Sequence, residues 1–230
     1  MFYGIDRYYL ILVVPALLIS MYAQWKVSST FKAFSSTATR SGLTGAGIAR
    51  KILDLNGLQN VRVERIAGNL TDHYDPRDNV VRLSDTVYGS ASISAVGVAA
   101  HETGHAVQHA TKYVPMRIRA AIIPATNIGS KLSIPLVMFG LLFSIPMLTE
   151  IGIIFFSLST VFQLVTLPVE FNASHRAIAT LDSTGLVSDV EKSGVRKVLT
   201  AAALTYVAAL LVAIAQLLRL VLLFGRHNDD

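Results

Sequence analysis

His101-Glu102-Thr103-Gly104-His105, near the middle of the 230-residue chain, follows the pattern H-E-x-x-H. Residues four apart are neighbours on one face of a helix, so the two imidazoles of this pentad can reach a single metal ion. Glu102 stands beside the first imidazole, close enough to act on a water bound to that ion. The spacing therefore predicts a zinc site of the hydrolytic kind on a helix.

The residues around the pentad favour a helix. Ser92 or Ser94 can cap its start, and small apolar residues before His101 give it a face that packs. No proline interrupts the run between these caps and Pro115. The alternative is a surface helix whose histidines are only solvated or capped.

A catalytic zinc ion normally has three protein ligands and one open position, so a third ligand must come from another part of the chain. The chain contains no cysteine, which leaves histidine and carboxylate as ligand types. His73 and His175 are candidates, and His109 lies one turn further along the same helix. Glu170 is the fourth candidate, and the membrane layout favours it.

Hydrophobic residues make up 52% of the chain and the mean hydropathy is +0.51, more than a soluble globular domain needs. The excess lies in four segments near the length that spans a bilayer: residues 8–23, 132–148, 151–169 and 198–224. The first has no cleavage site, which favours an anchor over a cleaved signal peptide. Only Thr149 and Glu150 separate the second and third, which predicts a helical hairpin. The sequence thus predicts a mainly α integral membrane protein with about four transmembrane helices.

Four spans place residues 24–131 and 170–197 on one side of the membrane. Both termini and the turn at Thr149 then lie on the other side. Glu170 returns to the side that holds His101, at the end of the third span, where it can serve as the third ligand. An ordinary interfacial carboxylate is the alternative.

Basic residues near the span ends indicate the orientation, because the cytoplasmic side of a membrane protein has the excess. The side with the pentad holds Lys26, Lys32, Lys112, Arg117, Arg119, Lys131, Arg176, Lys192, Arg196 and Lys197, whereas the opposite side holds Arg7 and Arg226. We expect a multi-pass protein of the plasma membrane, with the catalytic side cytoplasmic and both termini outside. The net charge is +5, and the basic residues lie close to the ends of the spans and are not interleaved with aromatic residues. This predicts contact with anionic lipid headgroups and no nucleic-acid partner.

The region between the first span and the end of the zinc helix is small, so it is expected to lean on the membrane helices or on a partner. Thr44 can cap a helix over residues 45–55, ended by Asn56-Gly57. Residues 61–66 and 79–83 alternate like two strands, with residues 75–78 turning between them. Residues 80–83 then form an exposed edge that either accepts an extended peptide or is purely structural.

The chain resembles the YugP-type neutral zinc metallopeptidases, a family of small bacterial multi-pass membrane proteins. The resemblance covers nearly the whole length and rests on residues 70–77, 80–84, 96–106 and 167–174. The last stretch is also similar to the Glu-x-x-Ala-Asp segment of HtpX-like and prenyl-protein membrane peptidases, in which the Glu is the third zinc ligand. Glu170 and Ala173 match that segment. Ser174 stands where those relatives have Asp, which puts a carboxylate behind the ligands in doubt.

The resemblance implies a small α+β, zincin-like catalytic region on one side of the membrane and one zinc ion per chain. The ligands are expected to be His101, His105 and Glu170, with Glu102 as the general base of a metalloendopeptidase. Supporting or transition-state roles fall to polar donors in the two segments with motifs: His73, Tyr74, His175 and Arg176. The expected parts are an N-terminal transmembrane anchor (1–25), the region with the pentad (26–119), a linker and transmembrane hairpin (120–169), the third-ligand segment (170–197), and a C-terminal transmembrane helix and tail (198–230).

Two other classes of function stay open at this point. One is a non-catalytic zinc-bearing membrane scaffold or adaptor for other membrane proteins. The other is an intramembrane protease, against which the short apolar run before His101 and the lack of an Asn-Pro-Asp-Gly segment both argue. The expected partners are a peptide or protein substrate and the lipid bilayer, with membrane-protein partners or a homo-oligomer left open.

Overall fold

The computed structural model describes residues 6–224, so Arg226, one of the two basic residues expected on the side of the termini, lies outside the described residues. The chain divides into two compact units. The helical unit comprises Met1–Gln24, Ile118–Leu167 and Thr205–Asp230. The motif unit comprises Trp25–Arg117 and Pro168–Leu204 and includes the pentad and Glu170.

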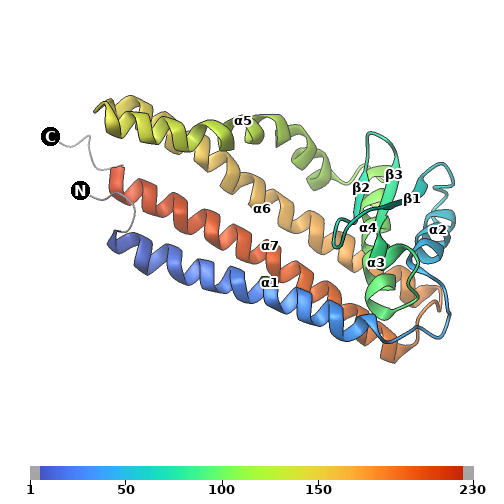
Figure 1. The fold of residues 1–230 in the computed structure, drawn as a ribbon. Helices are drawn as coiled ribbons and strands as arrows, with labels where there is room; N and C mark the ends of the chain where they lie inside the picture. The colour runs from blue at the N-terminus through green and yellow to red at the C-terminus, as the bar shows by residue number, and fades with distance from the viewer. Residues whose placement is uncertain (1–5, 225–230) are drawn as a thin grey trace. The chain divides into compact units, whose positions relative to one another are not determined.

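Parts of four long helices make up the described part of the helical unit, and α1, α6 and α7 continue into the motif unit (Figure 1). They are α1 (Val14–Ser35, preceded by the π-helical turn η1, Tyr9–Val13), α5 (Val114–Leu142), α6 (Pro146–Ser183) and α7 (Asp189–Phe224). Within residues 6–224, these four helices are long and apolar enough to cross a membrane. The prediction of a mainly α membrane protein with about four spanning helices is confirmed.

The turn of the helical hairpin lies elsewhere than predicted. The helices break at residues 143–145, and α6 begins at Pro146, so Thr149 and Glu150 are already helical. Proline suits the first position of a helix because its fixed φ matches and its missing N–H has no partner there anyway. Thr149 is buried against Gly140 of α5. The prediction of a turn at Thr149 and Glu150 is wrong, because both residues belong to α6 and the polar side chain of Thr149 packs in the helix contact.

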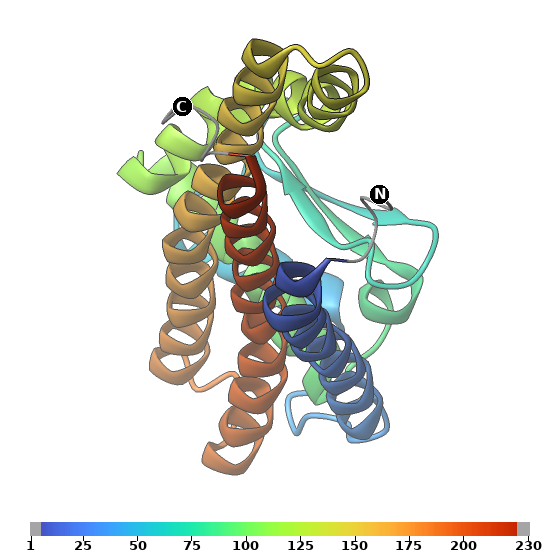
Figure 2. The ribbon, with the colours of Figure 1, turned by 90° about the vertical axis from the view of Figure 1, so that its left-hand side faces the viewer.

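The N-terminal end of α1, together with η1 and Asp6 before it, contacts α7 within the helical unit, and both views show α1 and α7 side by side (Figure 1, Figure 2). Arg219 forms an ion pair with Asp6 at 2.7 Å and lies over the ring of Tyr9. Val13 and Ala16 pack with Ala215. The α5–α6 turn and the end of α7 line one cavity of about 350 Å³, so they lie at the same end of this unit.

The helices of the motif unit begin where their caps predict. Thr44 caps α2 (Gly45–Leu55) by accepting from the N–H of Gly47 at 3.2 Å, and Gly57 follows with a φ of +71°. Ser92, rather than Ser94, caps α4 (Ile93–Ala110). The short α3 (Asp85–Tyr88) leads into α4.

The core of this unit surrounds α4. Side chains from α2, the sheet, α6 and α7 pack against it, and its members include Ile48, Leu53, Val81, Leu83, Val96, Leu181 and Val195. Nearly every residue of α4 is buried as a result. The polar residues of the pentad therefore need partners within the protein, because buried polar groups are costly without them.

The sheet differs from the predicted hairpin. Its strands are β1 (Arg62–Ile66), β2 (His73–Asp75) and β3 (Val80–Ser84), in the order β1-β3-β2. β1 pairs with β3 in parallel, and β2 pairs with β3 antiparallel. The turn at residues 76–79 therefore joins β2 to β3, and the predicted edge at residues 80–83 is wrong because β3 is central. β2 went unpredicted since three residues are too few to show alternation.

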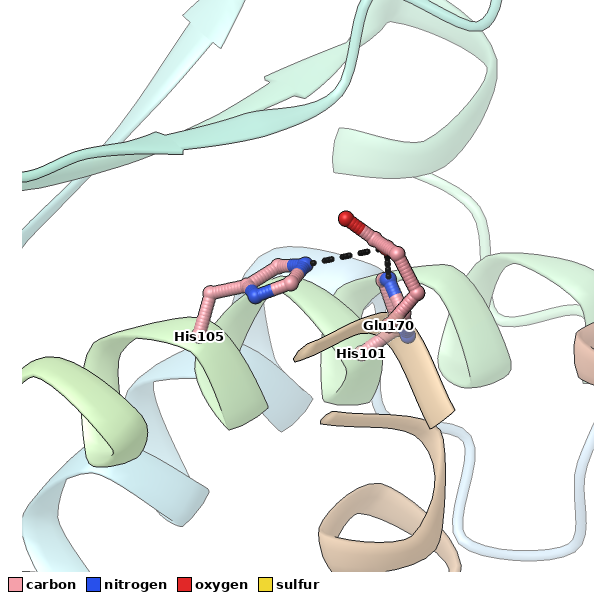
Figure 3. Close-up of side chains that lie close together, drawn as sticks. All are labelled: His101, His105 and Glu170. Carbon is pink, nitrogen blue, oxygen red and sulfur yellow. Dashed lines mark hydrogen bonds and ion pairs between the residues drawn. The ribbon is translucent and has the colours of Figure 1, made fainter. Parts of the chain in front are cut away.

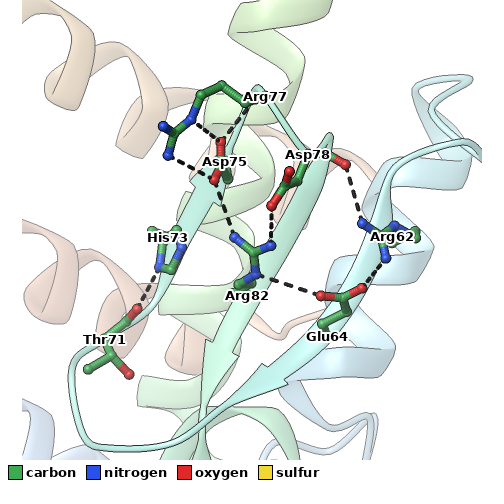
Figure 4. A network of polar contacts seen from close by, with 8 residues as sticks. All are labelled: Arg62, Glu64, Thr71, His73, Asp75, Arg77, Asp78 and Arg82. Atoms are coloured by element: carbon green, nitrogen blue, oxygen red, sulfur yellow. Dashed lines mark hydrogen bonds and ion pairs between the residues drawn. The ribbon is translucent and has the colours of Figure 1, made fainter. Parts of the chain in front are cut away.

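A network of charged side chains holds the three strands together on one face of the sheet (Figure 4). Arg82 of β3 contacts Asp75 at 3.3 Å, Asp78 at 2.5 Å and Glu64 at 3.6 Å. The backbone N–H and the guanidinium of Arg77, together with Arg82, lower the pKa of Asp75 to about 2. His73 shares this face, so Tyr74 points to the opposite face by the alternation of a strand.

Candidate metal centre

His101 and His105 of α4 meet Glu170 of α6 (Figure 3). One ligand atom from each residue lies within 4.8 Å of the other two. The Nε2 atoms of His101 and His105 lie 3.3 and 3.4 Å from Oε2 of Glu170. Glu170 is only 3% exposed. Two histidines of one helix and a carboxylate from a distant part of the sequence thus lie close enough together to share one metal ion.

The chemistry of these donors fits a zinc ion. Two imidazole nitrogens and one carboxylate oxygen are the ligand types that zinc takes in catalytic sites, and three protein ligands leave a position open. Burial disfavours the imidazolium form of His105, but the hydrogen bond with Glu170 and the charge of Glu102 outweigh it, so the pKa of His105 is raised. The two carboxylates therefore make the surroundings of His105 favourable to a cation.

Each imidazole has a partner at its other nitrogen. Nδ1 of His101 lies 3.1 Å from Oγ of Ser174, and Nδ1 of His105 lies 3.0 Å from Oε1 of Gln108. The sequence put a carboxylate at position 174 in doubt, and a hydroxyl occupies the corresponding place. Both Nε2 atoms are left to face Glu170, as metal ligation requires.

Gln108 was missed by the sequence interpretation. It is fully buried, and its Nε2 donates to the carbonyl of Val169 and to Oδ1 of Asn172, on either side of Glu170. The only signal in the sequence is its place three residues after His105 on the same helix face. The partners on α6, which give Gln108 its importance, lie about 60 residues away and leave no local pattern.

A close helix contact brings Glu170 to the histidines. A Cβ at Gly104 would lie 2.7 Å from the carbonyl oxygen of Ala173, nearer than a real Cβ approaches an oxygen. Gly104 and Ala173 therefore let the backbones of α4 and α6 touch between the ligands. Thr103, the residue before Gly104, is also buried, and its hydroxyl donates to the carbonyl of Ala100 within α4.

The structure separates the four supporting candidates. The hydroxyl of Tyr74 lies 2.9 Å from Nδ1 of His109, one turn beyond His105 on α4. The ring of His73 lies on the face of the sheet with the charged network and forms a hydrogen bond with the carbonyl of Thr71. His73 is therefore not brought to the proposed ligands. Burial, and then the charge of Asp75, raise the pKa of Tyr74.

Arg176 and His175 line a groove of about 250 Å³ beside α4. Nε of Arg176 donates to Oδ1 of Asn172 at 2.8 Å, and its guanidinium lies 6.0 Å from the ring of Tyr113. Arg176 is thus connected to the ligands through Asn172 and Gln108, whereas the side chain of His175 is exposed. Neither residue is part of the three-ligand cluster found among residues 6–224.

Comparison with known proteins agrees with this geometry. Residues 9–225 match a family described as "Putative neutral zinc metallopeptidase". The chain is 49% identical over 222 residues to "Putative membrane protease YugP" of Bacillus subtilis (strain 168), which covers 96% of this chain and 99% of that protein. No solved structure matches the chain. The chain belongs to this family of zinc metallopeptidases, and the predicted resemblance is confirmed.

The contact at Gly104 yields a test of how the ligands are brought together. Gly104→Ala should destabilise the protein by about 1–3 kcal/mol, because the added Cβ overpacks the contact with Ala173. The zinc content of this variant should also fall, since Glu170 would move away from the histidines. Thermal unfolding and metal content of the detergent-purified protein measure both effects.

Gly97→Ala is the matched control on the same helix. Its Cβ would lie 3.4 Å from Val195, an ordinary contact, and alanine favours a helix over glycine. We expect unchanged zinc content and equal or higher stability. Equal behaviour of the two variants would contradict the importance of the Gly104 contact.

Proposed function

We propose that this chain is a zinc-dependent metalloendopeptidase of the membrane, with one zinc ion per chain held by His101, His105 and Glu170. The convergence of three ligand atoms within 4.8 Å, supplied by two helices, is the main support. Glu102 belongs to the same α4 and is 8% exposed, so its carboxylate is shielded from bulk water. Membership of a zinc metallopeptidase family agrees with this chemistry.

A zinc ion held by these residues would polarise the scissile carbonyl and lower the pKa of water. The Glu102 carboxylate accepts the proton of the attacking water and passes it to the leaving nitrogen. Its charge helps to raise the pKa of His105, which supports a role beside the proposed ligands. Ser174 and Gln108 orient the two imidazoles through their Nδ1 atoms.

Two of the supporting candidates keep a role in this proposal. Tyr74 holds the free edge strand β2 to α4 through its bond with His109, beside the ligands. Arg176 supports the ligands indirectly, through Asn172. His73 and His175 receive no role, since neither is directed to the cluster.

The proposed location is the cell membrane, with the motif unit on the cytoplasmic side and both termini outside. The excess of Lys and Arg near the span ends on the side of the pentad supports this orientation. These basic residues would contact anionic headgroups of the inner leaflet. The substrate is a peptide or protein that reaches that side.

The role of Glu102 is tested by Glu102→Gln, which keeps the shape of the side chain but cannot accept a proton. We expect bound zinc to be retained and peptide hydrolysis to fall by about 10²–10⁴-fold, the usual contribution of a general base. Metal analysis and hydrolysis of an unfolded protein substrate by the purified variant measure the two effects. Glu64→Gln, on the charged face of the sheet, is the control and should keep full activity.

Undiminished hydrolysis by Glu102→Gln would overturn its role as the base. Complementation of a deletion strain distinguishes the peptidase from the scaffold alternative. A variant without hydrolysis that restores a deletion strain as well as the wild type does would identify a non-catalytic scaffold.

Membrane sidedness is tested by single cysteines, because the chain has none of its own. Ser144 in the α5–α6 turn and Lys112 at the end of α4 both have exposed side chains. In intact cells a membrane-impermeant maleimide should label Ser144→Cys and label Lys112→Cys only after lysis. The wild type should remain unlabelled, and the reverse pattern would contradict the proposed orientation.

A further inference from the structure

We propose that Gln108 is a positioning residue of the metal centre: its buried side-chain amide fixes the tautomer of His105 and joins the helix of the histidines to the segment that supplies Glu170. The inference rests on the proposed metal-dependent function. It assigns the role to a residue outside H-E-x-x-H and outside the ligand set.

The orientation of the Gln108 amide follows from its neighbours on α6. The carbonyl of Val169 can only accept a hydrogen bond, and it lies 2.8 Å from the amide nitrogen of Gln108. The amide N–H₂ group must therefore point to α6. Its oxygen is then left to face Nδ1 of His105, at 3.0 Å.

A second anchor fixes the same orientation independently. The Arg176 guanidinium has only donors, and its Nε lies 2.8 Å from Oδ1 of Asn172. Asn172 therefore presents its oxygen to Arg176. The same oxygen accepts from Nε2 of Gln108 at 3.0 Å. Two acceptors on α6 thus take both N–H groups of one fully buried amide.

The orientation of this amide determines the state of His105. Because the oxygen of Gln108 can only accept, Nδ1 of His105 must hold the proton. Nε2 then presents a lone pair toward Oε2 of Glu170 across 3.4 Å. Two acceptors that face each other at this distance repel unless a cation lies between them, so the geometry favours a metal ion or a proton there.

His101 lacks such a constraint. Its Nδ1 faces the hydroxyl of Ser174, which can donate or accept by rotating. Ser174 holds the ring in place but does not select its tautomer. Gln108 is therefore the residue that prepares an imidazole for metal binding before the metal arrives.

Gln108 also fixes where Glu170 lies. Its two acceptors, Val169 and Asn172, flank Glu170 on α6 at one residue before and two residues after. A shift of α6 along α4 would break both hydrogen bonds. The same side chain therefore positions the second and the third ligand relative to each other.

The test compares Gln108→Met with Gln108→Glu. Methionine matches the length of glutamine but neither accepts from His105 nor donates to α6, and we expect zinc to bind about 10–100-fold more weakly, the usual cost of losing a residue behind a metal ligand. Glutamate keeps an acceptor for His105, so Gln108→Glu should bind zinc at least tenfold more tightly than Gln108→Met does. Chelator competition on the detergent-purified full chain measures each dissociation constant.

Nitrogen NMR of ¹⁵N-histidine-labelled, metal-free protein gives a second readout. Above the pKa of His105, the wild type and Gln108→Glu should show the Nδ1–H tautomer, and Gln108→Met should show a mixture. Gln59→Met, in an exposed loop, is the control and should match the wild type in both measurements.

Zinc affinity of Gln108→Met equal to that of the wild type would overturn the inference. If Gln108→Met fails to fold, as circular dichroism would show, Gln108→Glu still decides the question. Loss of the Nδ1–H tautomer in that variant would overturn the inference, and its retention would support it. A wild type without affinity for zinc would instead overturn the proposed function.

Discussion

The candidate metal centre depends on one close contact between two helices. Gly104 of α4 and Ala173 of α6 let the helix backbones touch, and this approach places Glu170 against His101 and His105. The two histidines are neighbours on one helix turn, whereas the carboxylate comes from a part of the chain some 65 residues later. A bulkier residue at this crossing would separate the ligands without changing any of them. The contact therefore brings the two histidines of the sequence motif together with the proposed third ligand.

Burial makes that site favourable to a cation. Glu170 is 3% exposed and Glu102 is 8% exposed, and carboxylates removed from water need compensating charge or hydrogen bonds. The neutral side chains behind the imidazoles, Ser174 and Gln108, orient the rings but add no positive charge. A divalent ion between the ligands would supply the compensation. It would also cross-link the two segments that make up the motif unit, residues 25–117 and 168–204.

Local signals in the sequence predicted some parts of the structure well. Thr44 and Asn56-Gly57 mark the start and the end of α2 as expected, because capping depends on residues next to the helix. Glu170 was predicted as the third ligand from topology and from resemblance, and its side chain lies beside the two histidines, although its role as a ligand stays a prediction. β2 and the pairing of β1 with β3 were missed, since non-local pairing leaves no periodic signal in three residues. Gln108 was missed for the same reason, because its hydrogen-bond partners are distant in sequence.

Metal content per chain, measured on wild type and Glu170→Ala purified side by side in detergent, tests the central claim most directly. The account predicts close to one zinc ion per wild-type chain and a sharp fall in the variant, with Glu64→Ala unchanged. Zinc fully retained in Glu170→Ala would place the third ligand elsewhere and contradict the three-ligand site. A wild type that binds no metal would contradict the proposed peptidase and favour a scaffold.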